Sequence, residues 1–408
     1  MSGVSQRIDA EALTAYLETR IDGFRGPLEI EKFAGGQSNP TYRLKTGSQS
    51  YVMRTKPGPK ATLLPSAHAI EREYRVQSAL ARSEVPVARM YCLCEDESVI
   101  GRAFYVMEHV EGRIFWDQSL PDASAAERAA IYDELNRVVA TLHRTDYVSL
   151  GLADYGKPGN FFGRQIDRWT SQYRAAEDER ISAIDGLVEW LPANVPHEDP
   201  PSVCVVHGDY RIDNLMFHPT EPRVLAVLDW ELSTLGHPLV DFAYHMMGWH
   251  NPPGALNGIA GLDIAGLGIP SERDYLERYL RRSGFQLSAD WSFFLAFGYF
   301  RYAAILQGIA RRAKEGTASS PRAKERGKLA GPSPTRLADR AKGRPTADQA
   351  ADGGSGGRLG SAQSAVRGGL ELHETFEGDV VGEGAHLRCP KTADAVAGVD
   401  PVVGVGAA

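Results

Sequence analysis

Residues 205–214, VVHGDYRIDN, bring a histidine, two aspartates and an asparagine close together, and VLAVLDWE follows at 224–231. Asp209 can orient or deprotonate a hydroxyl group, and the amide oxygen of Asn214 can hold a metal ion. Asp229 ends an apolar run, so it can face a cleft while the strand behind it stays rigid. A base, a metal-binding oxygen and a second carboxylate outside the loop are the groups that phosphoryl transfer to a hydroxyl requires.

The spacing of this segment distinguishes a catalytic loop from an ordinary polar turn. His207, Asp209 and Asn214 follow the order His-x-Asp-x-x-x-x-Asn, which is also the spacing of the kinase catalytic loop. Taken singly, each residue has a structural explanation, because Gly-Asp is a common turn and Asn can cap a helix. The joint pattern, with apolar runs on both sides, favours the catalytic loop. His207 is expected to hold the loop through backbone hydrogen bonds.

A phosphate-binding region is expected upstream. The segment AGGQSN lies between two predicted strands, and its small residues let backbone amides approach phosphate oxygens. The following strand, YVMRTK, carries Arg54 and Lys56 on one face, and only one of the two is expected to reach the phosphates. Glu71 and Glu73 on the next helix are the candidates for orienting that cation. The phosphate-binding residues predicted in the loop are Gly35, Gly36, Gln37 and Ser38.

The elements that must position these residues change character along the chain. Apolar alternation predicts three short strands within 28–56 and two more at 87–94 and 103–109, with a helix at 66–83 that Ser66 would cap. The runs 213–218 and 224–229 are predicted to form a small hairpin. Helical periodicity dominates after Gly112, at 124–145, 161–176, 181–191, 239–248, 271–283 and 289–314.

These patterns predict an α+β protein of two lobes joined near EHVEG. The expected division is an N-terminal helix at 1–27, a strand-rich nucleotide-binding lobe at 28–110 and a helical lobe with the catalytic loop at 111–331. A low-complexity tail follows at 332–408, where Phe376 is the one aromatic residue. The tail is expected to be disordered, because it has too few apolar side chains to form a core. It could be a natural extension or a shifted reading frame.

Composition and charge indicate which classes of binding partner and which cellular compartment to expect. The net charge of −7 and the pI of about 5.9 argue against a nucleic-acid partner. The four cysteines show no zinc-binding spacing, and the N-terminus has no apolar signal segment. The longest apolar stretch, 291–310, contains Arg301 and is expected to be a buried helix rather than a membrane span. A cytoplasmic protein without a membrane partner is therefore expected, and its oligomeric state stays open.

From about residue 28 to about 330, the chain resembles the aminoglycoside phosphotransferase/choline kinase-like family. The resemblance rests on GGQSNPTYRL, YVMRTK, EREYRVQSAL, VPVARM, FYVMEHVEG, VVHGDYRIDNLMF and VLAVLDWELSTLGHPLVDFAYHM. Three of its stretches, GGQSNPTY, LLPSAHAIEREYRV and LDWELSTLGHPLVDFAY, are similar to the branch that is fused ahead of acyl-CoA dehydrogenase domains in some animal proteins. The resemblance implies a protein-kinase-like fold with a strand-rich N-lobe and a helical C-lobe.

The resemblance also implies roles for individual residues. Asp209 would be the catalytic base, Asp241 would brace the loop, and Glu73 would be the helix carboxylate that orients the phosphate-binding cation. Arg54 stands where the family usually has lysine, so either Arg54 or Lys56 would contact the phosphates. The residues implied for Mg²⁺ are Asn214 and Asp229, and those implied for the adenine pocket and hinge are Met107, Glu108 and Val110.

The expected function is ATP- and Mg²⁺-dependent phosphorylation of a hydroxyl group on a small molecule. The branch resemblance points to a hydroxyacyl group, for instance in a CoA thioester. An aminoglycoside or another antibiotic is the first alternative, although a polycationic acceptor would favour a more acidic C-lobe than this sequence has. A nucleotide-binding pseudokinase that serves as an interaction module is the second. A metal-dependent hydrolase is disfavoured, because no histidine cluster accompanies the acids.

Overall fold

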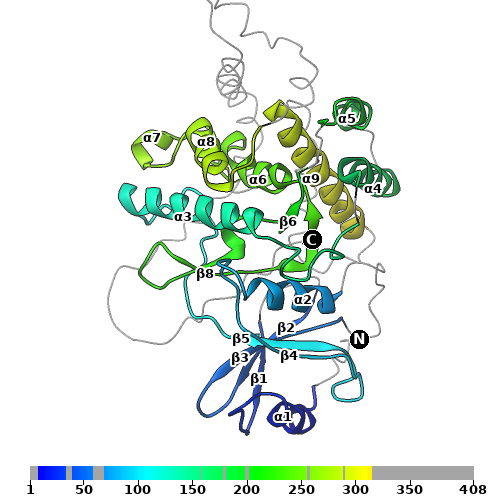
Figure 1. The fold of residues 1–408 in the computed structure, drawn as a ribbon, viewed down its shortest axis with the longest axis vertical. Coiled ribbons are helices and arrows are strands. Elements are labelled where there is room, and N and C mark those ends of the chain that lie inside the picture. The colour runs from blue at the N-terminus through cyan, green and yellow to red at the C-terminus, as the bar shows by residue number, and fades with distance from the viewer. Residues whose placement is uncertain are drawn as a thin grey trace, which may run out of the picture.

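The protein has a strand-rich N-lobe and a helical C-lobe. In Figure 1 the N-lobe lies below the C-lobe. This computed structural model describes residues 8–33, 39–57, 69–157, 159–177, 181–197, 202–254, 258–287 and 290–314. The predicted tail at 332–408 and the predicted phosphate-binding residues Gly35, Gly36, Gln37 and Ser38 lie outside these ranges. Within them, the α+β fold of two lobes predicted from the sequence is confirmed.

The N-lobe is one antiparallel five-stranded sheet with two helices. The strands are β1 (Glu29–Lys32), β2 (Thr41–Lys45), β3 (Ser50–Thr55), β4 (Met90–Cys94) and β5 (Phe104–Glu108), in the order β1-β2-β3-β5-β4. Helix α1 (Ala10–Glu18) packs against an apolar cluster on the sheet that includes Leu13, Leu17 and Phe104. Helix α2 (Ile70–Leu80) lies between the sheet and the C-lobe. The central position of β3 explains why nearly all of its side chains are buried.

Two predicted boundaries in the N-lobe are wrong. The strand expected at 87–94 begins at Met90, because the backbone before it leaves the sheet: the carbonyl oxygen of Pro86 accepts from Val227 in the C-lobe. The helix expected at 66–83 begins at Ile70. It follows Ala69, which makes no side-chain capping hydrogen bond. The proposed cap, Ser66, lies outside the described residues.

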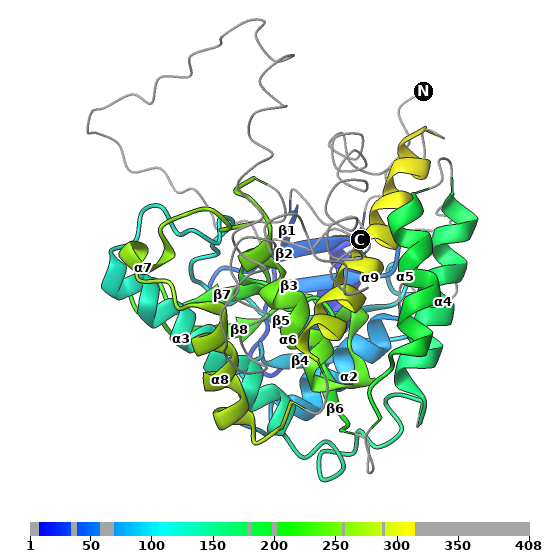
Figure 2. The same cartoon turned by 90° about the horizontal axis from the view of Figure 1, so that it is seen from above.

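The C-lobe is built mainly of helices. They are α3 (Ala125–Arg144), α4 (Phe161–Ala176), α5 (Ser182–Ala193), α6 (Pro238–Met246), α7 (Ile264–Leu267), α8 (Glu272–Ser283) and α9 (Trp291–Lys314), with single 3₁₀ turns at Ile212–Asn214, Trp230–Leu232 and Met247–His250. Figure 2 shows α4, α5 and α9 together on one side and α3, α7 and α8 on the other, in agreement with their contacts. Helix α3 begins at an N-cap, in which the hydroxyl of Ser124 accepts from the backbone N–H of Glu127.

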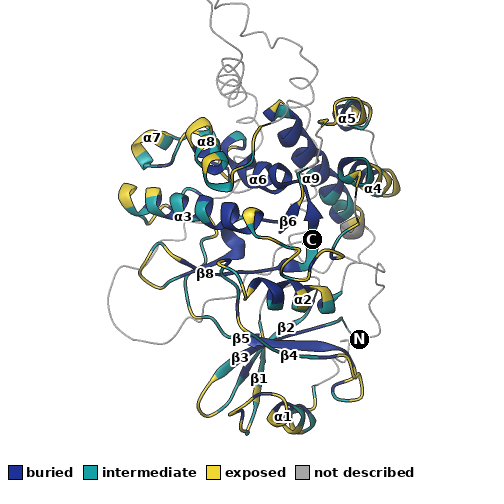
Figure 3. Ribbon diagram, in the orientation of Figure 1, coloured by how far each residue is buried: buried dark blue, intermediate teal, exposed yellow. Residues whose placement is uncertain are grey.

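Helix α9 is buried in the C-lobe, as the sequence predicted. It packs against α4, α5 and α6, and Figure 3 shows α6 and α9 as the most buried helices of the lobe. In the described part of the chain, Trp291–Arg311 is the one helix that is long and apolar enough to cross a membrane. Because 78% of its most apolar window is buried inside the molecule, the helix serves as a core element here.

Four short strands frame the predicted catalytic loop. β6 (Cys204–Val206) pairs with β9 (Thr234–Gly236), and β7 (Leu215–Phe217) pairs with β8 (Val224–Val227). The second pair is the small hairpin expected from the sequence, whereas the pairing of β6 with β9 was not predicted. The loop therefore leaves one ladder at Val206 and enters another at Leu215, so both of its ends are fixed.

Candidate active site

The loop after β6 is held by one buried carboxylate. Asp241, on α6, accepts hydrogen bonds from the backbone N–H groups of His207 and Gly208, the latter at 2.7 Å. His143, on α3, lies 3.4 Å from the same carboxylate through its Nε2. Burial alone would raise the pKa of Asp241, but its contacts with His143 and His207 outweigh burial and lower that pKa. Asp241 thus braces the loop, in agreement with the expectation from the sequence.

His207 supports the same loop through its ring. Its Nε2 lies 2.7 Å from the carbonyl oxygen of Leu228, and its Nδ1 accepts the N–H of Asp209 at 3.2 Å. Both ring nitrogens contact the backbone, as expected for a structural histidine. Gly208 has a φ of +87°, and a Cβ there would lie 2.6 Å from the carbonyl oxygen of Leu232. This turn therefore requires glycine.

Asp209 is buried and is oriented by two side chains. The amide of Asn214 donates to its Oδ2 at 3.0 Å and to its carbonyl oxygen at 2.9 Å. Arg211 places its Nε 3.4 Å from the other carboxylate oxygen and donates from Nη2 to Asp213 at 3.0 Å. The carboxylate therefore has a fixed direction at the loop tip. Arg211 was not predicted from the sequence, although its place two residues after the predicted base was a usable signal.

Asn214 and Asp229 come together at the open end of the hairpin of β7 and β8, because Asn214 directly precedes β7 and Asp229 follows β8. The N–H of Leu228 donates to the carbonyl oxygen of Asn214 at 2.8 Å, so Asp229 follows directly across the ladder. Asp229 has a left-handed backbone with φ of +63°, which is uncommon for a residue other than glycine. Such strain persists where the surrounding structure holds it, and it often marks functional residues.

The donor set fits the Mg²⁺ ion that the sequence implied. The Oδ1 of Asn214 is buried and has no hydrogen-bond partner among the described residues. The Asp229 carboxylate lies near two further acids, Glu73 and Glu231, and all three share one cation, Arg54. This leaves excess negative charge for a divalent ion. No cluster of three or more His, Cys, Asp or Glu side chains in the described ranges could hold a metal alone. Mg²⁺ typically takes one or two carboxylates and completes its shell with water and substrate phosphates.

Arg54 connects the N-lobe to two acids of the C-lobe, the predicted metal ligand Asp229 and Glu231. Its Nε lies 3.1 Å from Glu73, and its Nη2 lies 2.9 Å from Asp229 and 3.2 Å from Glu231. Although burial acts to lower the pKa of Arg54, these carboxylates outweigh it and raise that pKa well above its usual value. Burial raises the pKa of Glu73, against the opposing charge of Arg54. Glu231 was not predicted, yet it lies in the LDWE motif two residues after Asp229.

The structure separates the two candidate cations that the sequence left open. Lys56 forms an ion pair with Glu71, and its side chain is one-third exposed. Arg54 instead pairs with Glu73, whose carboxylate also accepts from Asn39 at 2.8 Å and from Tyr105 at 3.0 Å. Arg54 and Glu73 therefore face the predicted metal site, while Lys56 and Glu71 form a separate pair nearer solvent.

The predicted hinge lies where β5 leaves the sheet. Met107 is buried. The exposed Glu108 donates its N–H to the carbonyl oxygen of Arg89 and accepts the N–H of Arg89 through its carboxylate, which fixes the end of the strand. Val110 packs against apolar clusters of both lobes, one containing Met107 and the other Met216. These residues line an apolar junction between the lobes, where an adenine ring could lie.

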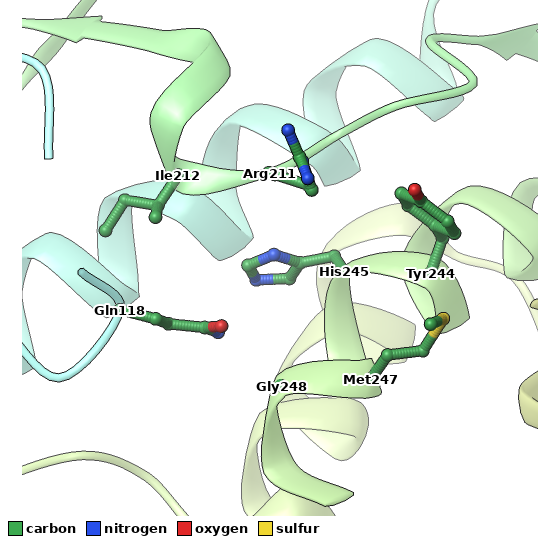
Figure 4. Close-up of a pocket in the computed structure, with 7 residues that line it drawn as sticks. All are labelled: Gln118, Arg211, Ile212, Tyr244, His245, Met247 and Gly248. Carbon is green, nitrogen blue, oxygen red and sulfur yellow. The ribbon is translucent and has the colours of Figure 1, made fainter. Parts of the chain in front are cut away.

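A small pocket opens beside Arg211 in the C-lobe. It is lined by Gln118, Arg211, Ile212, Tyr244, His245, Met247 and Gly248, which Figure 4 shows around one space. Arg301, from the middle of α9, donates to the carbonyl oxygen of Gly208 and lies over the ring of Tyr244 at 5.0 Å. A charged residue inside an apolar helix was the sequence signal for this contact, but its partner could not be inferred. The pocket thus adjoins the predicted base through Arg211.

Comparison with known proteins agrees with this geometry. The profile described as "Phosphotransferase enzyme family" matches residues 29–291. Acyl-CoA dehydrogenase family member 10 of mouse is 45% identical over 325 residues, covering 79% of this chain and 30% of that protein. Member 11 of mouse is 44% identical over 320 residues, covering 77% of this chain and 41% of that protein. The chain therefore spans less than half the length of these curated relatives.

Solved structures show the same fold. A crystal structure of a candidate aminoglycoside phosphotransferase from Ralstonia eutropha is 59% identical, covers 83% of this chain and all of its own, and superposes with a TM-score of 0.77. A choline kinase from Cryptosporidium parvum is 11% identical with a TM-score of 0.53, covers 79% of this chain and 94% of its own, and shows likeness of fold alone. The matched segment contains the loop from His207 to Asn214, the predicted metal ligand Asp229, and Arg54 with its three acids, and the chain belongs to the phosphotransferase enzyme family.

Proposed function

We propose that this protein transfers the γ-phosphoryl group of ATP to a hydroxyl group of a small hydroxyacyl compound, such as a CoA thioester. The observation that carries the proposal is the convergence of Asp209, Asn214 and Asp229 at the ends of two short ladders, with Arg54 reaching the same edge from the N-lobe. This is the arrangement that kinase-type phosphoryl transfer requires.

In the proposed reaction each residue has one task. Asp209 orients the acceptor hydroxyl and accepts its proton as the oxygen attacks the γ-phosphorus, while ADP leaves. Asn214 and Asp229 would hold Mg²⁺, which would neutralise charge on the phosphates. Arg54 would contact the phosphates through Nη1, because its Nε and Nη2 already face the acids. Glu73 keeps Arg54 directed toward the cleft.

Support for the hydroxyacyl acceptor comes from the relatives, whose names are those of acyl-CoA dehydrogenases. An aminoglycoside acceptor has support from the name of the Ralstonia eutropha protein. The residues that line the pocket beside Asp209 favour the acyl compound, because they include no acid to bind a polycation. A spectinomycin phosphotransferase of the same fold was solved with ADP, which supports an adenine nucleotide as donor. A cytoplasmic location is part of the proposal, since the described cysteines are free.

The test is an ADP-release assay with ATP, Mg²⁺ and a panel of hydroxyl compounds. The panel holds hydroxyacyl-CoAs that differ in hydroxyl position, the free hydroxy acids and several aminoglycosides. We expect turnover with hydroxyacyl-CoAs and a loss of roughly 10²–10⁴-fold in Asp209→Asn. Asp22→Asn, an exposed aspartate in the N-lobe, is the matched control and should keep full activity.

Three results would contradict the proposal in different ways. Turnover with aminoglycosides but with no hydroxyacyl compound would assign the antibiotic as acceptor. ATP binding without turnover of any acceptor would instead assign a pseudokinase. Equal activity of Asp209→Asn and the unmodified protein would show that Asp209 is not the base.

A further inference from the structure

The pocket beside Arg211 has a rigid wall that the reaction described above does not use. This wall is the segment before α3, and the buried Arg128 holds it through its guanidinium. Arg128 donates to the carbonyl oxygens of Ser119, Leu120 and Ala123 at 2.7–2.8 Å. Tyr132 donates to the carbonyl oxygen of Gln118 at 2.7 Å. The backbone that carries Gln118 is therefore fixed from two sides.

The side chain of Gln118 is buried but incompletely hydrogen-bonded. It is 5% exposed, and its Nε2 has no hydrogen-bond partner in the part of the chain that the structure describes. Figure 4 shows this side chain extending toward the pocket, beside His245 and Gly248. Gly248 makes room for the amide, because a Cβ there would lie 2.1 Å from its Oε1. A buried donor without a partner is uncommon and calls for an explanation, such as a ligand.

The other polar groups of the pocket suit an oxygen-rich ligand. Arg211 supplies hydrogen-bond donors, and its charge is already balanced by Asp209 at 3.4 Å and Asp213 at 3.0 Å. His245 is buried, and burial lowers its pKa to about 4, so its ring is neutral near pH 7. The seven lining residues include no aspartate or glutamate. A carbonyl or carboxylate oxygen would be matched by the amide of Gln118, whereas no lining carboxylate is present to pair with an ammonium group.

We propose that Gln118 is a specificity-determining residue, whose amide donates a hydrogen bond to the acyl carbonyl or carboxylate oxygen of the acceptor while the acceptor's hydroxyl lies at Asp209. The inference rests on the proposed function and adds the group that recognises the acyl end. It explains both the unpaired amide and the glycine at position 248. Gln118 acts on binding, so its loss should raise the KM for the acceptor and leave kcat and the nucleotide site largely unchanged.

The experiment compares two acceptors in the full-length protein. One is 3-hydroxybutyryl-CoA, and the other is the thioether S-(3-hydroxybutyl)-CoA, in which a methylene replaces the carbonyl group. For Gln118→Leu, we expect the KM of the thioester to rise roughly tenfold or more, because a buried hydrogen bond is lost. The KM of the thioether should change less than about twofold, since that acceptor has no oxygen for the amide. The KM for ATP should stay the same.

Two further variants separate recognition from folding. Gly248→Ala keeps the amide but pushes it aside, so it should reproduce the thioester effect. Gln49→Leu, at an exposed turn of the N-lobe, should leave both acceptors unaffected. An equal rise in KM for both acceptors, or no rise for either, would overturn the role of Gln118 and leave the kinase assignment intact. If the unmodified protein phosphorylates neither compound nor any other hydroxyacyl-CoA of the panel, the proposed function itself fails, and the inference fails with it.

Discussion

Replacing Arg54 tests the link between the two lobes most directly. Its guanidinium lies within 3.2 Å of three carboxylates, whose side chains are each less than a tenth exposed. Arg54→Met would leave Glu73, Asp229 and Glu231 buried without their shared counter-charge. Removing one partner of a buried ion pair typically costs about 3–5 kcal/mol, since the remaining charge stays desolvated. We therefore expect the free energy of unfolding to fall by about that much.

Two related substitutions refine this expectation. Arg54→Lys restores the charge but not the planar fork, so it should cost roughly 1–2 kcal/mol and lower activity less than Arg54→Met does. Lys56→Met is the matched control. Because Lys56 and Glu71 form a partly exposed pair, this change should cost no more than about 1 kcal/mol.

Urea denaturation followed by tryptophan fluorescence gives the stability change, and the ADP-release assay gives the KM for ATP. Arg54→Met should unfold at clearly lower urea and bind ATP more weakly. If Arg54→Met unfolds at the same urea concentration as the unmodified protein, the buried ion-pair argument is refuted. If Lys56→Met loses ATP affinity while Arg54→Met keeps it, Lys56 is the phosphate-binding cation and the assignment of Arg54 is wrong.

Four further outcomes are expected. Asn214→Ala should raise the Mg²⁺ concentration for half-maximal activity at least about tenfold, because even outer-shell partners of a metal carry that much affinity; an unchanged Mg²⁺ titration would contradict its role as a ligand. Gly208→Ala should lower the free energy of unfolding by roughly 1–2 kcal/mol or more, because Gly208 has a φ of +87° and a Cβ there would meet the carbonyl oxygen of Leu232. Gly47 has open space around it, so Gly47→Ala should change that free energy little. Asp241→Asn should lower the free energy of unfolding, measured in urea, by roughly 3 kcal/mol, because the amide group that replaces one carboxylate oxygen would face a backbone N–H. A change below about 1 kcal/mol would mean that Asp241 does not brace the loop. Burial lowers the pKa of His245 in the folded protein from 6.5 to about 4, so its contribution to the free energy of unfolding is present above pH 6.5 and is lost as pH falls toward 4. Up to about 3 kcal/mol of that free energy should disappear over this window. In urea titrations at several pH values, His245→Gln should flatten the dependence of stability on pH.

Much of the site could be predicted from the sequence because its residues are close along the chain. The spacing from His207 to Asn214 and the apolar run before Asp229 are local features, and a hairpin brings their ends together. Helical periodicity likewise identified α3 and α9, whose apolar faces repeat over many turns. The start of β4 at Met90 could not be predicted, because it depends on the pairing of Pro86 with a strand more than a hundred residues away.

The sequence by itself determined the family of folds, the catalytic loop and the chemical types of its residues, since those follow from local spacing and periodicity. Which acids Arg54 and Lys56 pair with was decided only by the tertiary structure. Arg54 lies in β3 and Lys56 directly follows that strand, and the difference arises from which acids the C-lobe and α2 bring to each. The unpaired amide of Gln118 also appears only in three dimensions, because burial and the absence of a partner are properties of packing rather than of sequence.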